Sequence, residues 1–449
     1  IMDFPKNFVW VAATAAYQIE GAAYGADKGG HVWDAAGRQR HYIFENHTAE
    51  VGCDHYHRFR EDVALMKEMG LKAYRFSVCW PRLMPNGTGK VSDAGRRFYD
   101  ELIDELLKAG IEPYMTLFHW EYPYELFHRG GWLNPNSPGW FEEYAANIAK
   151  FYSDRVRHFI TVNEPQCFIG LGLYEGTHAP YLKYPIDEAL IAWHNTLKAS
   201  GLAVKALRAH AKQPAEVGVT VATAVKMPHD PAKDAAAAEY ANFSYTCPTF
   251  FTNSFFTDPV VFGRYPEGMF EGFGVKPFYT QSDMEIIKSD IDFIGLNIYS
   301  GEYVTADGNG RVCTVTPGMN TPKTDMRWNV HPECLYYGPK AFYERYKLPV
   351  YITENGVAVT EWLSSDGTLA DPSRVQFIRE YLKQLARASE DGADVRGYFY
   401  WSLMDNFEWT EGFSKRFGLI YVDYDTKKRI LKDSAKFYAD VIRTNGKNL

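Results

Sequence analysis

The segment Val350-Tyr-Ile-Thr-Glu354-Asn-Gly-Val357 carries the pattern that decides the fold. Its apolar start is typical of a buried strand, and a carboxylate, Glu354, follows just before the turn-forming Asn355-Gly356. The upstream segment His158-Phe-Ile-Thr-Val-Asn-Glu164-Pro165 has the same pattern, with proline as its stop. In a barrel of parallel strands, the C-terminal ends of all the strands meet at one face. The two segments therefore predict two glutamates that point into one pocket.

Strand and helix patterns alternate along the rest of the chain. Apolar runs bounded by Gly, Pro and polar residues predict strands at 8–14, 73–80, 113–120, 158–164, 217–222, 291–297, 350–353 and 395–401. Helical spacing of apolar residues predicts helices at 57–69, 93–109, 140–152, 187–211 and 373–388, of which Gly70 and Gly110 stop the first two. Eight such strands close a barrel, and no linker or composition shift marks a second domain. We therefore expect an α/β fold in which residues 1–449 form a single (β/α)8 TIM barrel.

Two of the intervening segments, Gly21 to His57 and Thr305 to Pro339, are long and rich in Gly, Pro, His and Trp. Insertions of this kind usually form the walls of a binding cleft. We expect both segments to be long loops at the C-terminal face of the strands.

Composition limits the partners. The net charge is −8 and no basic tract is present, which argues against nucleic-acid binding. No apolar stretch reaches the length of a membrane span, and Ile1 to Lys6 lacks the pattern of a signal peptide. The 6 cysteines stand singly, as is typical of thiols in a reducing compartment. We expect a cytoplasmic protein without a nucleic-acid or membrane partner. Aromatic residues make up 16% of the chain, more than a core needs, and surplus aromatics often face sugar rings.

Polar and aromatic residues recur at the predicted strand ends, where a purely structural barrel does not need them. Any one of them could be an ordinary hydrogen-bonded residue, and either glutamate alone could form a salt bridge. Their recurrence on many strands favours a functional site instead. A pair of carboxyl groups is what glycoside hydrolysis requires, since one protonates the leaving oxygen and the other attacks the anomeric carbon or activates water. The residues concerned are Gln18, Arg75, His119, Trp120, Asn163, Glu164, Asn297, Glu354, Trp401, Glu408 and Trp409.

The two glutamate segments resemble the signature motifs of glycoside hydrolase family 1, the β-glucosidase family, and the resemblance covers essentially the whole chain. Thr161 to Pro165 resembles the T-x-N-E-P acid/base motif, and Ile352 to Gly356 matches the I/V-T-E-N-G nucleophile motif. The resemblance implies that Glu164 is the general acid/base and Glu354 the nucleophile. It implies net retention of configuration through a covalent glycosyl-enzyme, with no cofactor or metal.

The same resemblance implies supporting roles around the glutamates. Arg75 matches an arginine beside the nucleophile, which would lower the pKa of Glu354, and Tyr299 matches a tyrosine that hydrogen-bonds the same carboxylate. The charge of Glu354 would in turn raise the pKa of Glu164 and keep that acid protonated. The residues that match sugar-binding or leaving-group positions are Gln18, His119, Trp120, Asn163, Asn297, Tyr299, Trp328, Trp401, Glu408, Trp409 and Phe417.

Two positions bear on the substrate. The family's 6-phospho-glycosidases resemble this chain but have serine at the place of Glu408 and tyrosine at that of Phe417. An anionic Glu408 would repel a phosphate, so we expect an unphosphorylated sugar. Cys53-Asp-His-Tyr-His57 resembles a helix entry of the family, and no second ligand pair makes it a metal site.

The function expected from the resemblance is that of a retaining β-glucosidase acting on terminal nonreducing glucosyl residues of cellobiose, short β-gluco-oligosaccharides and aryl β-glucosides. A β-galactosidase, β-fucosidase or transglycosylase on the same scaffold is the enzymatic alternative. A non-catalytic sugar-binding protein is the alternative from another class, and the presence of both glutamates argues against it.

Overall fold

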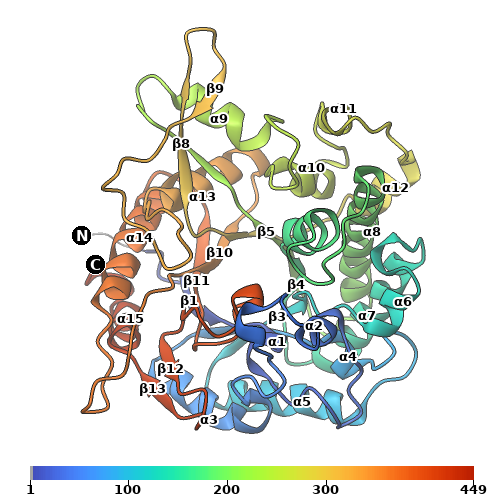
Figure 1. The fold of residues 1–449 in the computed structure, drawn as a ribbon, viewed down its shortest axis with the longest axis vertical. Helices are drawn as coiled ribbons and strands as arrows, with labels where there is room; N and C mark the ends of the chain where they lie inside the picture. Colours follow the sequence, from blue (N-terminus) through green and yellow to red (C-terminus); the bar gives the residue numbers. More distant parts are fainter. Residues whose placement is uncertain (1–3) are drawn as a thin grey trace.

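The computed structural model describes residues 4–449, and its centre is a closed barrel of parallel strands (Figure 1). The order around the barrel is β1-β2-β3-β4-β5-β7-β10-β11, and β11 pairs back to β1. Every predicted strand is present, which confirms the (β/α)8 barrel. The bounds are β1 Val9–Ala13, β2 Ala73–Ser77, β3 Glu112–Phe118, β4 His158–Asn163, β5 Glu216–Ala222, β7 Phe293–Asn297, β10 Val350–Asn355 and β11 Val395–Trp401.

The barrel strands are buried on both faces. All residues of β2 and of β10 are buried, because side chains alternate between the barrel interior and the surrounding helices. Strands of this kind have apolar residues at successive positions rather than at every second one. Polar residues in them, such as Arg75 and Thr353, are therefore conspicuous.

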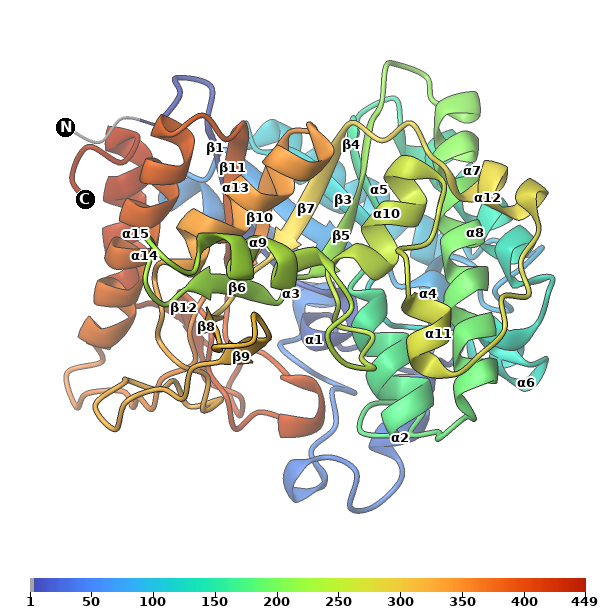
Figure 2. The same cartoon turned by 90° about the horizontal axis from the view of Figure 1, so that it is seen from above.

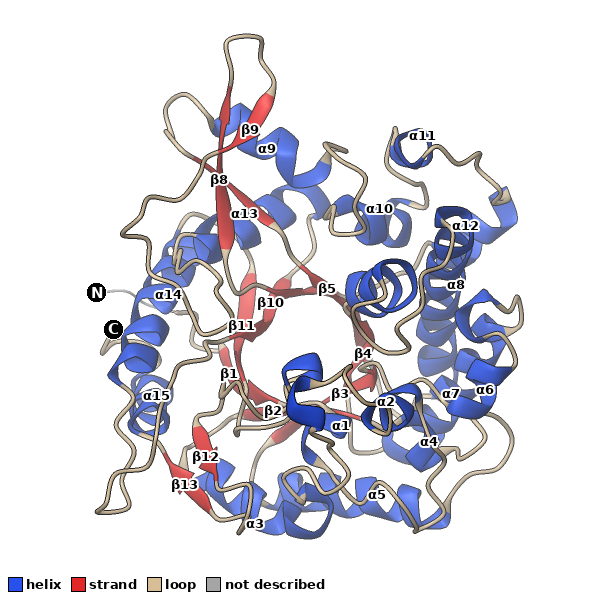
Figure 3. Ribbon diagram, viewed as in Figure 1, coloured by secondary structure: helices blue, strands red, loops and turns tan. Residues whose placement is uncertain are grey.

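Helices surround the barrel on the outside (Figure 3). The predicted stops are confirmed: Gly70 and Gly110 follow the ends of α3 and α5 with φ of 73° and 74°, a backbone conformation that glycine adopts at little cost. The helices that follow successive barrel strands include α3 His55–Glu68, α5 Asp93–Lys108, α7 Ser137–Tyr152, α8 Ile186–His210, α12 Gln281–Ile287, α13 Cys334–Tyr346, α14 Pro372–Glu390 and α15 Asp433–Thr444.

Shorter elements are added to this frame, mostly in the connections at the C-terminal ends of the strands (Figure 2). The three-stranded sheet β6-β8-β9 follows closely on the ends of β5 and β7. Its bounds are β6 Val225–Pro228, β8 Gly301–Ala306 and β9 Val312–Thr314, and a separate hairpin pairs β12 Ile420–Val422 with β13 Arg429–Leu431. The short helices are α1 Ala16–Ile19, α2 Val32–Gly37, η1 Phe44–Asn46, α4 Trp80–Leu83, α6 Tyr124–His128, η2 Gly131–Leu133, η3 Gln166–Glu175, α9 Ala235–Phe243, α10 Ser254–Phe262, α11 Met269–Phe273 and η4 Trp409–Glu411.

Among residues 4–449, no helix combines the length and the apolar character needed to cross a lipid bilayer.

Candidate active site

A cavity of about 1030 Å³ contains most of the predicted site residues. Both glutamates line it, as expected for side chains at the C-terminal ends of barrel strands. Its volume is at the upper end of the range of about 300–1,000 Å³ that is usual for ligand sites, so it has room for more than one sugar unit. The predicted residues in its lining are His119, Trp120, Glu164, Asn297, Tyr299, Trp328, Glu354, Trp401, Glu408 and Trp409.

The remaining predicted residues, Gln18, Arg75, Asn163 and Phe417, are buried behind this lining. Asn163 Oδ1 accepts a hydrogen bond from Asn297 Nδ2 at 3.1 Å, and Gln18 Nε2 lies 3.4 Å from Glu408 Oε2. Phe417 packs against Tyr299 and Trp328, with ring centroids 6.1 and 6.2 Å away. The structure therefore brings all the predicted residues together, in two layers.

The backbone departs from regular geometry where each glutamate leaves its strand. The pairing of β10 with β7 shifts between Ile352 and Glu354, and the pairing of β4 with β5 shifts between Ile160 and Asn163. Such bulges redirect side chains and are frequent beside active sites. Glu164 itself has φ of 50°, a conformation that is costly for a residue with a Cβ, and its amide is held by the carbonyl of Thr220 at 3.0 Å.

Glu354 has a hydrogen-bond donor on each oxygen. Arg75 Nη1 donates to Oε1 at 2.9 Å, and the Tyr299 hydroxyl donates to Oε2 at 2.6 Å. Burial raises the pKa of Glu354, while the charge of Arg75 and the Tyr299 hydrogen bond oppose that rise. Arg75 therefore lowers the pKa of Glu354, as predicted. The net shift is nevertheless upward, because both groups lie inside the barrel and burial has the larger effect.

Glu164 is held differently. Burial, followed by the charge of Glu354, raises the pKa of Glu164 to about 8. Asn297 Nδ2 donates to its Oε1 at 2.9 Å, and Cys167 Sγ lies 3.5 Å from its Oε2. The carboxyl group of Glu164 is therefore protonated at neutral pH. The predicted effect of Glu354 is present, although burial is the larger cause.

Two of the predicted site residues, Gln18 and His119, each have a buried polar atom without a hydrogen-bond partner among residues 4–449. Gln18 Nε2 donates to the carbonyl of Phe407 at 2.8 Å, and its Oε1 remains unpaired. Burial and the charge of Arg75 lower the pKa of His119 well below its usual value, so the ring is neutral. Asn163 Nδ2 lies 3.2 Å from His119 Nε2, which makes that nitrogen the acceptor and leaves a proton on the unpaired Nδ1. Buried polar atoms without partners are unfavourable, and sugar hydroxyls would satisfy both.

Aromatic rings form one wall of the cavity. Trp120 and Trp409 pack with ring centroids 4.4 Å apart, and Trp401 stacks on His119 at 5.7 Å. Both Trp120 and Trp409 have positive φ, at 95° and 50°, so their placement is held against local backbone preference. Flat apolar rings beside hydrogen-bonding groups suit the two-sided character of a sugar.

The sequence matches a known family over almost its whole length. The model of glycosyl hydrolase family 1 matches residues 2–447. The chain belongs to this family. It is a glycoside hydrolase, and enzymes of this family act with retention of the anomeric configuration.

Individual relatives match over nearly their whole length. The 1,4-beta-D-glucan glucohydrolase of Thermotoga neapolitana is 40% identical over 446 residues, covering 99% of each chain. Aryl-phospho-beta-D-glucosidase BglC of Bacillus subtilis is 36% identical over 482 residues, covering 100% of this chain and 98% of the other. The structure of the beta-glucosidase from Thermotoga maritima in complex with glucoimidazole has a TM-score of 0.91 and 39% identity, covering 99% of this chain and 100% of that one.

The cavity walls of this family 1 hydrolase differ in part from the prediction. The segment Thr305 to Pro339 contributes Val312, Thr314 and residues 326–329 to the lining, as predicted. The segment Gly21 to His57 follows the C-terminal end of β1 as predicted, but the prediction that it forms a wall of the cavity is wrong, because none of its residues, all of which the structure describes, lines the cavity. Trp33 of that segment instead packs behind Trp409, with centroids 4.7 Å apart. The segments 222–226 and 241–253 provide the wall that the prediction missed.

Sequence reasoning also missed three polar residues of the site. Asn406 Oδ1 accepts a hydrogen bond from Gln18 Nε2 at 3.1 Å, Cys167 lies beside Glu164, and Thr353 donates to Asn297 Oδ1 at 2.7 Å. The signal for Thr353 was its place as a polar residue in a buried strand. Nothing in the local sequence singles out Asn406 or Cys167.

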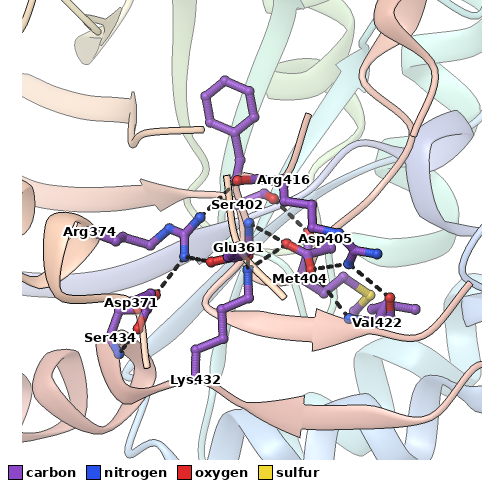
Figure 4. Close-up of polar contacts among 12 residues, drawn as sticks. Glu361, Asp371, Arg374, Ser402, Met404, Asp405, Arg416, Val422, Lys432 and Ser434 are labelled. Carbon is purple, nitrogen blue, oxygen red and sulfur yellow. Dashed lines mark hydrogen bonds and ion pairs between the residues drawn. The ribbon is translucent and has the colours of Figure 1, made fainter. Parts of the chain in front are cut away.

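A buried ionic cluster anchors the loop that carries Glu408 (Figure 4). Asp405 Oδ1 accepts from Lys432 Nζ at 2.7 Å and Oδ2 accepts from Arg416 Nη1 at 2.6 Å. Lys432 also pairs with Glu361, which in turn accepts from Arg374 Nη1 at 2.7 Å. Because Asp405 lies three residues before Glu408, the cluster ties the loop of Glu408 to α14 and to the chain beside β13.

The segment from Cys53 to His57 contains the start of α3, as predicted. His55 Nδ1 lies 2.7 Å from Asp62 Oδ2, whereas His57 is exposed beside Asp54. No group of three or more possible metal ligands gathers anywhere in residues 4–449.

Proposed function

We propose that this chain is an exo-acting β-glucosidase in which Glu354 is the nucleophile and Glu164 the general acid/base. The observation that carries the proposal is the contrast between two carboxyl groups in one cavity. Both oxygens of Glu354 accept hydrogen bonds from Arg75 and Tyr299, whereas Glu164 has its pKa raised to about 8. One group is thus prepared to attack and the other to donate a proton.

In the first step Glu354 attacks the anomeric carbon, and Glu164 donates its proton to the glycosidic oxygen as the bond to the leaving group breaks. The covalent bond removes the charge of Glu354, which had raised the pKa of Glu164. Glu164, now a carboxylate, takes a proton from a water molecule that attacks the same carbon from the side the leaving group vacated. Two displacements restore the β configuration.

The sugar that the cavity fits best is unphosphorylated glucose. Gln18 Oε1 and His119 Nδ1 are buried hydrogen-bonding atoms, Glu408 is a half-buried carboxyl group in the cavity lining, and a hexose ring would occupy the space beside the aromatic wall. The rest of the cavity would hold the leaving group, with Trp328 in its lining. Cellobiose, short β-gluco-oligosaccharides and aryl β-glucosides are the proposed substrates, in line with the glucan glucohydrolase named among the relatives.

Glu408 differs in charge from what the sequence predicted. Burial, followed by the charges of Glu354 and Glu164, raises the pKa of Glu408 to about 8, so Glu408 is mainly neutral at pH 7 rather than anionic as predicted. A phosphate at this place would still be repelled by the negative charge of Glu354, which also helps to raise the pKa of Glu408. We therefore keep unphosphorylated glucosides as the substrates, unlike the relative named as a phospho-glucosidase.

Replacing each glutamate tests the assignment. Glu354→Gly should abolish hydrolysis of an aryl β-glucoside, and added azide should restore turnover to give the α-glucosyl azide. Glu164→Gly with azide should give the β-glucosyl azide from a substrate with a good leaving group. Glu302→Gln, which changes an exposed carboxylate lining the same cavity, is the control and should retain activity. Products of the same configuration from both glycine variants would contradict the assignment.

A panel of aryl glycosides tests the sugar. Faster turnover of the β-galactoside or β-fucoside than of the β-glucoside would replace the proposed specificity, and transfer to added sugar exceeding hydrolysis would make the chain a transglycosylase. We also propose a cytoplasmic location, on the singly placed cysteines of the sequence, and fractionation of the source cells tests it.

A further inference from the structure

Asn297 connects the two strands that carry the glutamates. Its Nδ2 donates to Glu164 Oε1 at 2.9 Å, and its Oδ1 accepts from Thr353 Oγ1 at 2.7 Å. Thr353 is fully buried and immediately precedes Glu354, with its hydroxyl on the Asn297 side of β10.

The hydrogen bonds determine which way the Asn297 amide faces. Its Nδ2 also lies 3.1 Å from Asn163 Oδ1, an oxygen that accepts from Arg75 Nη2 at 2.7 Å. Nδ2 therefore points at two acceptors, and a reversed amide would place an oxygen against both of them. The Thr353 hydroxyl completes the arrangement, since Thr220 Oγ1 can donate to it at 3.4 Å and its own proton is free for Asn297 Oδ1.

This orientation has a consequence for the acid. Oε1 of Glu164 accepts a hydrogen bond from the Asn297 amide at 2.9 Å, whereas Oε2 has only the weak thiol donor of Cys167 at 3.5 Å, so the proton of the carboxyl group resides on Oε2. We propose that Thr353 is a positioning residue that, through Asn297, keeps the transferable proton of Glu164 on Oε2. The inference rests on the proposed role of Glu164. In the step itself the Oε2–H proton moves to the glycosidic oxygen, which keeps the electron pair of the breaking C–O bond, and Oε1 goes on accepting from Asn297.

The test uses two replacements of Thr353. Thr353→Val keeps the shape of the side chain and removes the hydroxyl, while Thr353→Ser keeps the hydroxyl. With valine, Asn297 Oδ1 loses its donor, so the amide is held less firmly and its hydrogen bond to Glu164 Oε1 weakens, which lets the proton move to Oε1. Methyl β-glucoside and cellobiose have leaving groups that need protonation. We expect their cleavage to fall by about 10- to 100-fold, which is part of the 10²–10⁴-fold that general acid catalysis contributes. A dinitrophenyl glucoside, which leaves without protonation, should change by less than about threefold.

The pH profile supplies a second readout. The Asn297 hydrogen bond lowers the pKa of Glu164 against the effects of burial and of Glu354, and Arg75 lowers it too. Cys167 is the other ionisable group in contact with Glu164. A weaker Asn297 hydrogen bond should therefore move the basic limb of kcat/KM to higher pH in Thr353→Val. Thr353→Ser should keep both the wild-type limb and the wild-type ratio between the two substrates.

Thr196→Val is the matched control. Thr196 is a fully buried threonine of α8 whose hydroxyl donates to the carbonyl of Ala192 at 2.9 Å, away from the cavity. It should leave the ratio between the two substrates unchanged. If Thr353→Val does not fold, Thr353→Ala replaces it, and activity on the dinitrophenyl glucoside reports the folded fraction. Equal loss on both substrates, or no loss on the poor leaving group, would overturn the role of Thr353. If Glu164→Gly also loses activity equally on the substrates with the poor and the good leaving group, the proposed function itself is wrong.

Discussion

Arg75 Nη1 lies 2.9 Å from Glu354 Oε1, and both side chains are buried inside the barrel. The same guanidinium donates through Nη2 to Asn163 on β4 and through Nε to Thr116 on β3 at 3.0 Å. One side chain from β2 thus joins the strands of both glutamates. Only a planar, forked donor reaches all three partners.

Arg75→Lys should therefore impair the nucleophile although the charge is kept. A lysine cannot serve Glu354 and Asn163 together, so the pKa of Glu354 should rise further and the acid limb of kcat/KM should move to higher pH. We expect kcat to fall by about 10²-fold, the scale for loss of one preorganised donor. Arg155→Lys, which changes a surface arginine paired with Asp100, is the control and should behave as wild type. An unshifted acid limb would argue against this account.

Activity should fall as the pH rises through about 8. The acid must be protonated, and burial together with Glu354 raises the pKa of Glu164 to about 8, so the protonated form dominates below that value and is lost above it. Measurements of kcat/KM for an aryl glucoside between about pH 5 and 10 would show the limb. In Glu164→Gln this basic limb should be absent, and its persistence would assign the titration to another group.

Glu408→Ser should weaken binding of glucosides. Loss of a hydrogen bond between this carboxyl group, which is mainly neutral at pH 7, and a sugar hydroxyl costs about 0.5–1.5 kcal/mol, which corresponds to about 2- to 10-fold in KM. The penalty should be smaller for a 6-phospho-glucoside, because the variant removes a carboxyl group from its vicinity. Paired kinetics on the two substrates test this, and Glu411→Ser, at a partly exposed position of the same cavity, is the control. A uniform loss on both substrates would mean that Glu408 does not discriminate between them.

Lys432→Met should destabilise the fold. The change leaves Asp405 and Glu361 buried with one cation fewer, and breaking such a pair costs about 3–5 kcal/mol. Denaturant unfolding measures the loss. Lys436→Met, which removes an exposed partner of Asp433, should cost no more than about 1 kcal/mol. A loss equally small at Lys432 would show that the cluster in Figure 4 contributes little to stability.

His158 should stabilise the opposite end of the barrel in a pH-dependent way. Burial opposes its protonation, but the carboxylates of Glu112 and Glu216, 3.3 and 3.2 Å from the ring nitrogens, outweigh burial and raise the pKa of His158 above 6.5. A raised pKa contributes stability that is fully present below the unfolded value and is lost as the pH rises through the folded value. The pKa values of Glu112 and Glu216 are lowered, so their contribution is present above 4.5 and is lost as the pH falls through their folded values.

His158→Gln should thus lower the urea midpoint most between those limits, near pH 5–6, and least near pH 9. His128→Gln, at a residue whose ring packs on Tyr124 without a carboxylate partner among the described residues, is the control. A midpoint difference that does not vary with pH would exclude this linkage.

The sequence predicted the barrel well because its strands are buried on both faces. Continuous apolar runs such as Tyr351-Ile352 and Phe159-Ile160 are typical of strands that are buried on both faces. Glycines such as Gly70 mark where helices end. The sheet β6-β8-β9 escaped prediction because β6 has only 4 residues and β9 only 3. Segments this short carry too little periodicity to be recognised.

The site was predictable to the extent that it lies in the two glutamate motifs and at strand ends. The hydrogen-bonding layer behind it was not, because its members acquire their roles only through partners far along the chain. Asn406 is meaningful only beside Gln18, and Thr353 only beside Asn297. The protonation state of Glu408 at pH 7 also could not be predicted from the sequence, since it depends on burial and on two other carboxyl groups.

The contact between Gln18 and the loop of Asn406 to Glu408 joins positions 388 to 390 residues apart. During synthesis the N-terminal part of the chain leaves the ribosome long before its partners exist. The pocket that we propose for glucose is therefore completed only when the last strand of the barrel and the loop after it have been made. A nascent or truncated chain that already contains both glutamates would still lack the residues proposed to bind the sugar.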